Sequence, residues 1–186
     1  FVDKLDPQSG TALEIGTSGD TVTIPTGVTV AGSMANTPAF KVYASSNTSC
    51  ASATNTTLAY NTETLDSDGC FNNTSGTVTL NGVSVPAYSF GPNVAGYYWV
   101  AAGGYFSSAA DYDNNRIFIE KNTTDSIADV NGRNLYYNGL FVGTVVHLNG
   151  SSDTVRVRVI QSSGGSVDFV SAVTNAGFSG YKLIGA

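Results

Sequence analysis

The sequence predicts a single all-β domain preceded by a short β-rich segment, and two observations support this fold class. First, the 186 residues include 21 Gly, 10 Tyr and 9 Phe, which is typical of short strands joined by many turns. Second, short runs of alternating apolar and polar residues recur between turn signals, and no segment has a convincing helical period. The length suits one domain with a short appendage.

The first 36 residues differ from the rest of the chain. Residues 13–30 contain no aromatic residue, and their Val, Ile and Thr alternate with period two between Gly and Pro turns. One such ribbon cannot bury its own apolar side, whereas three copies around an axis can. We therefore expect residues 1–36 to form a β-rich trimeric shaft or attachment segment, the alternative being a flexible linker.

Residues 37–186 form the second predicted unit, a succession of strands. The hairpin at 77–85 is expected because Asn81-Gly82 favours the tight turn that joins two antiparallel strands. The polar stretch 45–73 should be mostly loop with short strands. Regular spacing of the remaining strands predicts a sandwich or barrel, with strands over 39–43, 96–102, 116–121, 134–137, 140–148, 155–160, 166–173 and 180–184.

Charge and hydropathy exclude two classes of partner. The chain has 8 basic and 14 acidic residues, and the basic ones are scattered, whereas nucleic acid and anionic membranes require clustered Lys and Arg. The longest largely apolar run, 94–106, is too short and too rich in Gly to span a bilayer. We expect neither nucleic-acid binding nor membrane insertion.

The two cysteines, Cys50 and Cys70, allow only one pairing. They lie in one polar stretch, so we expect a disulfide that closes a loop and contributes roughly 3 kcal/mol. Such a bond would place the protein outside a reducing cytosol. The alternative is two free thiols in a reducing cell. A zinc site is excluded, because His147 is the only histidine and no C-x-x-C motif occurs.

A calcium site has only an incomplete motif. Asp111, Asp113 and Asn115 give the D-x-D-x-N start of a calcium loop, but Arg116 stands where an EF-hand has Gly and Asn122 where it has Glu. The ordinary alternative is an Asx-rich turn between strands. We expect no cofactor, with these three residues as the candidates for binding Ca²⁺.

Catalysis has no support in the sequence. His147 lies within an alternating apolar strand, with no acid or nucleophile near it in the sequence, so we expect a packed or interface histidine. No nucleophile elbow, phosphate loop or metal triad occurs. The protein is therefore not expected to be an enzyme.

Three segments resemble the C1q/TNF-like family in order and spacing. Residues 88–100 (YSFGPNVAGYYWV) look like its signature, in which a Gly-x-Tyr-x-apolar strand follows a turn. Residues 145–159 resemble its paired late strands, and 178–184 (FSGYKLI) resemble its closing Phe-Ser-Gly-x-x-Leu strand. The resemblance covers about 37–186 and implies a jelly-roll β-sandwich that forms a compact homotrimer.

The N-terminal segment departs from animal members of this family, which often carry a collagen stalk. No Gly-x-y repeat occurs, and residues 16–25 are similar to stretches that precede C1q-like domains in fibre and other virion proteins of marine tailed phages. This implies a virion structural protein, a fibre or capsid-surface knob used for host or surface attachment. Its partners would be other virion proteins and a cell-surface glycan or protein receptor, and its location the virion surface or an extracellular space.

Two alternatives to a fibre remain open. One is a purely architectural capsid decoration protein, whose contacts are all with other coat subunits. The other is a secreted bacterial adhesin or lectin-like module.

The family pattern also assigns the two faces of the strands. It turns one row of side chains into the sandwich core, for which we expect Phe40, Phe90, Tyr98, Val100, Val155, Val157, Val159, Phe178 and Leu183. Alternation along the strands then places four residues on the opposite faces: Tyr97, Trp99, Arg156 and Arg158. These four are the candidates for a subunit interface or binding face. The aromatic pair could instead lie under loops or stack on sugar, and the arginines could be solvated.

Overall fold

The computed structural model describes residues 17–28, 36–107, 115–132, 139–171 and 177–184. The chain divides into two compact units, Phe1–Ala31 and Gly32–Ala186. Every element in the described residues is a strand, so the all-β prediction is confirmed. The described part of the chain has no helix long and apolar enough to cross a membrane.

In the first unit, residues 17–28 form two turns joined by an extended stretch. The Thr17 N–H donates to Asp20 Oδ2 over 2.7 Å and the Asp20 N–H donates back to the Thr17 carbonyl over 3.0 Å. The second turn has a bond of 3.3 Å from the Val28 N–H to the Pro25 carbonyl. No strand forms here, because a strand needs a hydrogen-bonded neighbour and the described residues provide none for 17–28. The predicted shaft strands are therefore not formed within residues 17–28.

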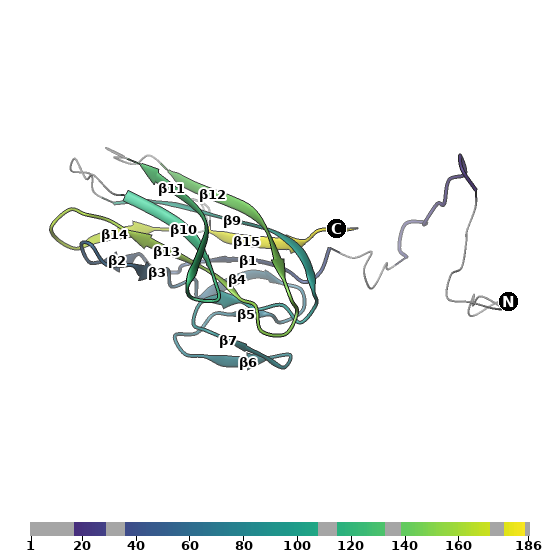
Figure 1. The fold of residues 1–186 in the computed structure, drawn as a ribbon, viewed down its shortest axis with the longest axis horizontal. Helices are drawn as coiled ribbons and strands as arrows, with labels where there is room; N and C mark the ends of the chain where they lie inside the picture. The colour runs from purple at the N-terminus through teal and green to yellow at the C-terminus, as the bar shows by residue number, and fades with distance from the viewer. Residues whose placement is uncertain (1–16, 29–35, 108–114, 133–138, 172–176, 185–186) are drawn as a thin grey trace. The chain divides into compact units, whose positions relative to one another are not determined.

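The larger sheet of the second unit has seven strands (Figure 1). Its order is β2-β14-β9-β15-β1-β4, with β12 on the other side of β9. The long β9 therefore pairs with β12 along one edge and with β15 and then β14 along the other. The bounds are β1 Ala39–Tyr43, β2 Thr48–Cys50, β4 Thr62–Asp66, β9 Gly96–Phe106, β12 Leu140–Leu148, β14 Val167–Val170 and β15 Phe178–Lys182.

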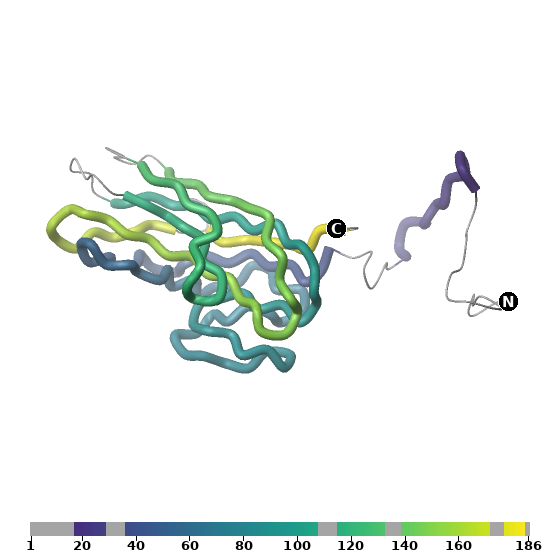
Figure 2. The backbone as a smooth tube through the Cα atoms, in the orientation of Figure 1, coloured from purple at the N-terminus to yellow at the C-terminus, as the bar shows by residue number. Residues whose placement is uncertain are grey.

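The second sheet has six strands in the order β11-β10-β13-β8-β5, and β3 also pairs with β13. Its strands are β3 Thr56–Thr57, β5 Phe71–Asn72, β8 Ser89–Phe90, β10 Asn115–Lys121, β11 Asp125–Gly132 and β13 Val155–Ile160. Figure 2 shows β11 running beside β12, so these two strands lie together at one side of the two sheets.

The predicted Asn-Gly hairpin is confirmed. Strands β6 Val78–Leu80 and β7 Val83–Val85 pair with each other in a separate two-stranded sheet. Asn81 and Gly82 both have positive φ, at 48° and 83°, as the turn that joins such short hairpins requires.

The other strand predictions vary in accuracy. Strands 39–43, 140–148 and 155–160 are confirmed at their bounds. The predicted strand at 180–184 begins earlier, at Phe178, because Phe178 and Ser179 already pair with β9. Strand β11 was not predicted, and 134–137 lies outside the described residues.

Apolar side chains from both sheets meet in one core, an arrangement consistent with a β-sandwich. Phe40 of β1 lies at its centre, stacked on Phe90 of the six-stranded sheet with ring centroids 4.3 Å apart. Its ring also meets the edge of Phe178 at 4.7 Å. All the predicted core residues are buried except Leu183, which is half-buried. Leu183 follows the last residue of β15, and its N–H still donates to the Tyr97 carbonyl of β9 over 2.8 Å.

Truncation of Phe40 tests how far this stacking holds the two sheets together. We expect Phe40→Ala to lower the free energy of unfolding by about 3–5 kcal/mol, because the residue is 1% exposed and leaves a large cavity. Denaturant titration at one protein concentration measures the change.

The matched control is Leu65→Ala on β4, whose side chain is 49% exposed. It should change the free energy of unfolding by no more than about 0.5 kcal/mol. Equal effects of the two substitutions would contradict the described packing.

Candidate functional site

The outer face of β9, β12 and β15 is apolar and exposed. Along β12, alternation buries Val142, Val146 and Leu148 in the core and points the intervening residues outward. The register places Val145 opposite Trp99 and His147 opposite Tyr97, and Tyr181 of β15 lies on the other side of Trp99. We call the resulting surface the apolar strip and define it as Tyr97, Trp99, Phe141, Val145, His147 and Tyr181.

The exposure of this strip is high for large apolar side chains. Phe141 is 62% exposed, Val145 50%, Tyr97 45% and Tyr181 43%. Isolated exposed apolar residues are common on proteins, but a contiguous group on one sheet face marks an interaction surface. The strip is therefore the strongest candidate for a functional site on the described part of the chain.

A glycine shapes the centre of the strip. The Trp99 indole lies against Gly143, so close that a Cβ on residue 143 would stand 2.9 Å from its Cζ2 atom. The same Cβ would meet the Cβ of Ala101 at 3.3 Å. The missing side chain lets the indole lie low on the sheet, which explains why Trp99 is half-buried while its neighbours are exposed.

Sequence reasoning placed Tyr97 and Trp99 on this face but did not name Phe141, Val145 or Tyr181. The available signal was the apolar character of both faces of 140–148, since a strand with one solvated face alternates with polar residues instead. Which strands lie beside β9 could not be deduced, because that depends on the register of distant segments.

The outer face of the six-stranded sheet is polar. Glu120 of β10 is 5% exposed and binds both predicted arginines of β13. Its Oε2 is 2.6 Å from Nη2 of Arg156 and its Oε1 is 3.0 Å from Nη1 of Arg158. Arg158 also donates to the Asn55 carbonyl over 2.8 Å. The arginines thus have partners within their own chain, which leaves less of their charge for another subunit.

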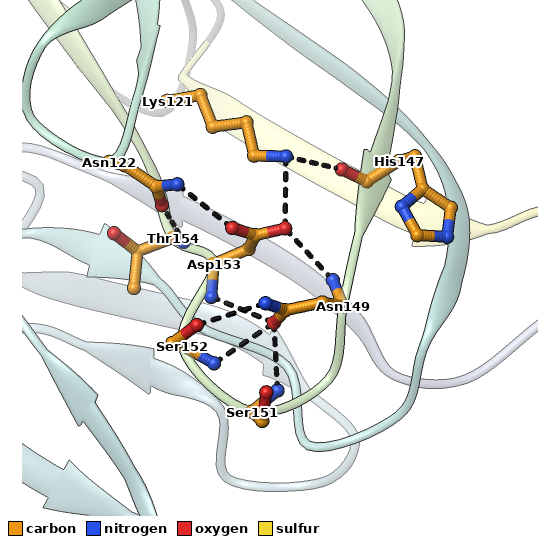
Figure 3. A network of polar contacts seen from close by, with 8 residues as sticks. All are labelled: Lys121, Asn122, His147, Asn149, Ser151, Ser152, Asp153 and Thr154. Carbon is orange, nitrogen blue, oxygen red and sulfur yellow. Dashed lines mark hydrogen bonds and ion pairs between the residues drawn. The ribbon is translucent and has the colours of Figure 1, made fainter.

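A polar cluster joins the end of β10 to the loop between β12 and β13 (Figure 3). Asp153 Oδ2 is 2.9 Å from Lys121 Nζ and accepts from the Asn149 N–H over 3.0 Å. Asp153 Oδ1 accepts from Asn122 Nδ2 over 2.8 Å. Asn149 Oδ1 accepts three backbone N–H groups of the following loop.

This cluster has a structural role. Burial raises the pKa of Asp153, but the hydrogen bonds from Asn122, Lys121 and the Asn149 N–H, together with the Lys121 charge, outweigh burial and lower it overall. The Asp153 carboxylate and the Asn149 amide are both bonded within the cluster, so the arrangement fixes the loop.

The calcium motif gains no support. Asp111 and Asp113 lie outside the described residues, and Asn115 is fully buried at the start of β10 with no hydrogen bond to its side-chain amide. Across the described ranges, no three His, Cys, Asp or Glu side chains come together as a metal site.

The predicted disulfide between Cys50 and Cys70 is wrong for this structure, in which both are free and buried. Cys50 ends β2 beside β14, and its thiol donates to the Thr48 carbonyl over 3.3 Å. Cys70 precedes β5 of the other sheet, and its thiol donates to Asn93 Oδ1 over 3.6 Å. The fold therefore gives the thiols different neighbours, a separation that a single polar stretch of sequence did not reveal.

No family model matches the chain, and no curated protein matches its sequence.

Alkylation tests the state of the cysteines. Burial raises the pKa of the Cys50 thiol to about 11 and also raises that of Cys70, so both remain protonated at neutral pH and should resist alkylation in the native protein. After denaturation without reductant, mass spectrometry should find both thiols labelled. Two unlabelled cysteines that become reactive only after reduction would contradict the structure.

Removal of the Asp153 charge tests the polar cluster. The lowered pKa means that Asp153 stabilises the fold above its ordinary unfolded value of about 3.9 and that this stabilisation is lost as the pH falls through the lower folded value. Asp153→Asn should therefore lower the free energy of unfolding by about 1–3 kcal/mol at pH 7.

The difference from wild type should shrink below about pH 4, where the wild-type carboxylate also becomes protonated. Exposed Asp125→Asn is the control and should change little at either pH. A difference for Asp153→Asn that persists unchanged at pH 2.5 would contradict the electrostatic role.

Proposed function

We propose that this chain is a structural protein of a tailed-phage virion. It forms a homotrimeric fibre or capsid-surface knob, with a C1q-like jelly-roll head for host or surface attachment and a shaft built from residues 1–36. The observation that carries the proposal is the apolar strip, because its exposed side chains need a partner and two further copies of the chain provide one.

The order of the strands supports the jelly-roll part of the proposal. The first and last strands of the head, β1 and β15, are neighbours in the larger sheet, and β15 lies between β1 and the long β9. The segments that resemble the family contribute to β8, β9, β12, β13 and β15, and they supply strands to both sheets.

The first unit supports the shaft. Val22, Ile24 and Val28 are 61%, 47% and 56% exposed, and Val22 and Ile24 share one side of the extended stretch by their period-two spacing. Asp20 is the only charged residue among 17–28, and its carboxylate is bonded to Thr17. Three copies packed around an axis would cover these apolar side chains and supply the missing strand partners.

A second candidate is a secreted adhesin or lectin-like module, favoured by the exposed rings of Tyr97 and Tyr181. Aromatic rings on a flat face can stack on sugar, and the strip would then stay open to solvent in the working protein. The oligomeric state distinguishes the two candidates, because a glycan platform needs no second copy.

We expect light scattering at micromolar concentration to give three times the chain mass of 19.2 kDa. Val145→Lys should give the mass of one chain with an unchanged circular dichroism spectrum, because it places a charge in the interface while the exposed side chain adds nothing to the core. Val130→Lys on β11, 36% exposed, is the control and should stay trimeric. A monomeric wild type would contradict the proposal.

The virion role has its own test. Gold-labelled antibody against the chain should bind intact phage particles at a fibre or at the capsid surface, and cryo-electron microscopy should show threefold density there. Absence of the chain from purified particles would contradict the virion role while leaving the trimer intact.

A further inference from the structure

The only histidine of the chain lies at one end of the apolar strip. We propose that His147 makes the subunit assembly sensitive to pH, so that protonation of its imidazole opens the trimer. This inference rests on the trimer proposed above, and it assigns a regulatory role to one residue of its interface.

The geometry places the imidazole among apolar neighbours. His147 stands opposite Tyr97 in the register of β12 and β9, and the two rings meet edge to face with centroids 5.1 Å apart. Val145, two residues earlier, points to the same side. Figure 3 shows the imidazole pointing away from the Asp153 cluster. A subunit that covers the strip would cover this ring as well.

The charged groups nearby have other partners or do not face the ring. Lys121 of β10 places its Nζ 2.9 Å from the His147 carbonyl oxygen, and Asp153 of the following loop is paired with that ammonium. Asp125 of β11 stands opposite Lys121 in the register. On β9 and β15 the facing groups are Tyr97 and Tyr181, since Lys182 belongs to the inner row. Among the described residues, no carboxylate forms an ion pair with His147.

The surroundings of the His147 imidazole differ between the free and the assembled subunit. In a single chain the imidazole is exposed and water solvates either form. In an apolar interface the neutral form fits and the imidazolium does not, because its charge would lose the water that solvates it in the free subunit. Imidazole takes up its proton near pH 6.5. The trimer is therefore stable above that pH and is lost as the pH falls below it.

Because a trimer covers three such rings, the dependence of its dissociation constant on pH is amplified. Each ring that must lose a proton contributes up to a tenfold weakening per pH unit, so three give up to about a thousandfold change in the trimer dissociation constant. The full chain should thus change from mainly trimer at pH 7.5 to mainly monomer at pH 5.5 at concentrations near the dissociation constant.

Sedimentation velocity of the full chain at these two pH values is the test. His147→Gln, which is neutral at both, should remain trimeric at both. His147→Phe gives a second pH-insensitive variant in case the amide weakens the interface. Glu63→Gln is the matched control, because it removes another titratable group, whose pKa is raised by burial and by the Asp66 charge. It should keep the wild-type pH response.

The outcomes separate this inference from the proposed function. A wild-type trimer that is equally stable at both pH values overturns the role of His147 and leaves the trimer standing. The role of His147 is likewise overturned if His147→Gln and His147→Phe dissociate on acidification as wild type does. A wild type that is monomeric at both pH values overturns the trimer and this inference together.

Discussion

Strands β9 and β12 of the larger sheet are apolar on both faces, and the proposed assembly of this molecule depends on that constraint. A strand can bury only one of its faces in its own sandwich. The inner rows of β9 and β12 fill the core with residues such as Tyr98 and Val146, while Val145 and Tyr97 remain in water. A second protein surface over the strip would remove this exposed apolar area, which is the physical reason to expect assembly.

The outer face of the six-stranded sheet carries charged side chains instead of an exposed apolar surface. Its outward-facing Glu120 is buried between Arg156 and Arg158, so the face is polar but its charges are satisfied within the chain. Removing one partner of a buried ion pair typically costs about 3–5 kcal/mol, so we expect this triad to hold β10 against β13. The outer face of the six-stranded sheet is thus covered by ion pairs within the chain, whereas the outer face of the larger sheet stays apolar and exposed to solvent.

Local pattern predicted much of the fold, and long-range register accounts for what it missed. Alternation located 39–43 and 155–160 at their bounds, because a strand with one face in the core keeps a strict period. Strand β11 was not predicted because it lies at the edge of its sheet and is largely polar. The candidate site was predicted in part: alternation turned Trp99 outward, but only pairing shows that Val145 and Tyr181 flank it. The predicted bond between Cys50 and Cys70 is absent from the structure for the same reason. The two residues lie in one stretch of sequence, but Cys50 belongs to the larger sheet and Cys70 precedes a strand of the other sheet.

The most direct test of the central claim measures whether water reaches the strip in the working protein. Trp99 is the only tryptophan, so its fluorescence reports on the strip alone, and acrylamide quenching measures its access to solvent. If other subunits cover the strip, quenching is weak at high protein concentration and rises on dilution, over the same range in which the mass falls to that of one chain. Quenching that is strong and independent of concentration would show that the strip stays open and would contradict the account.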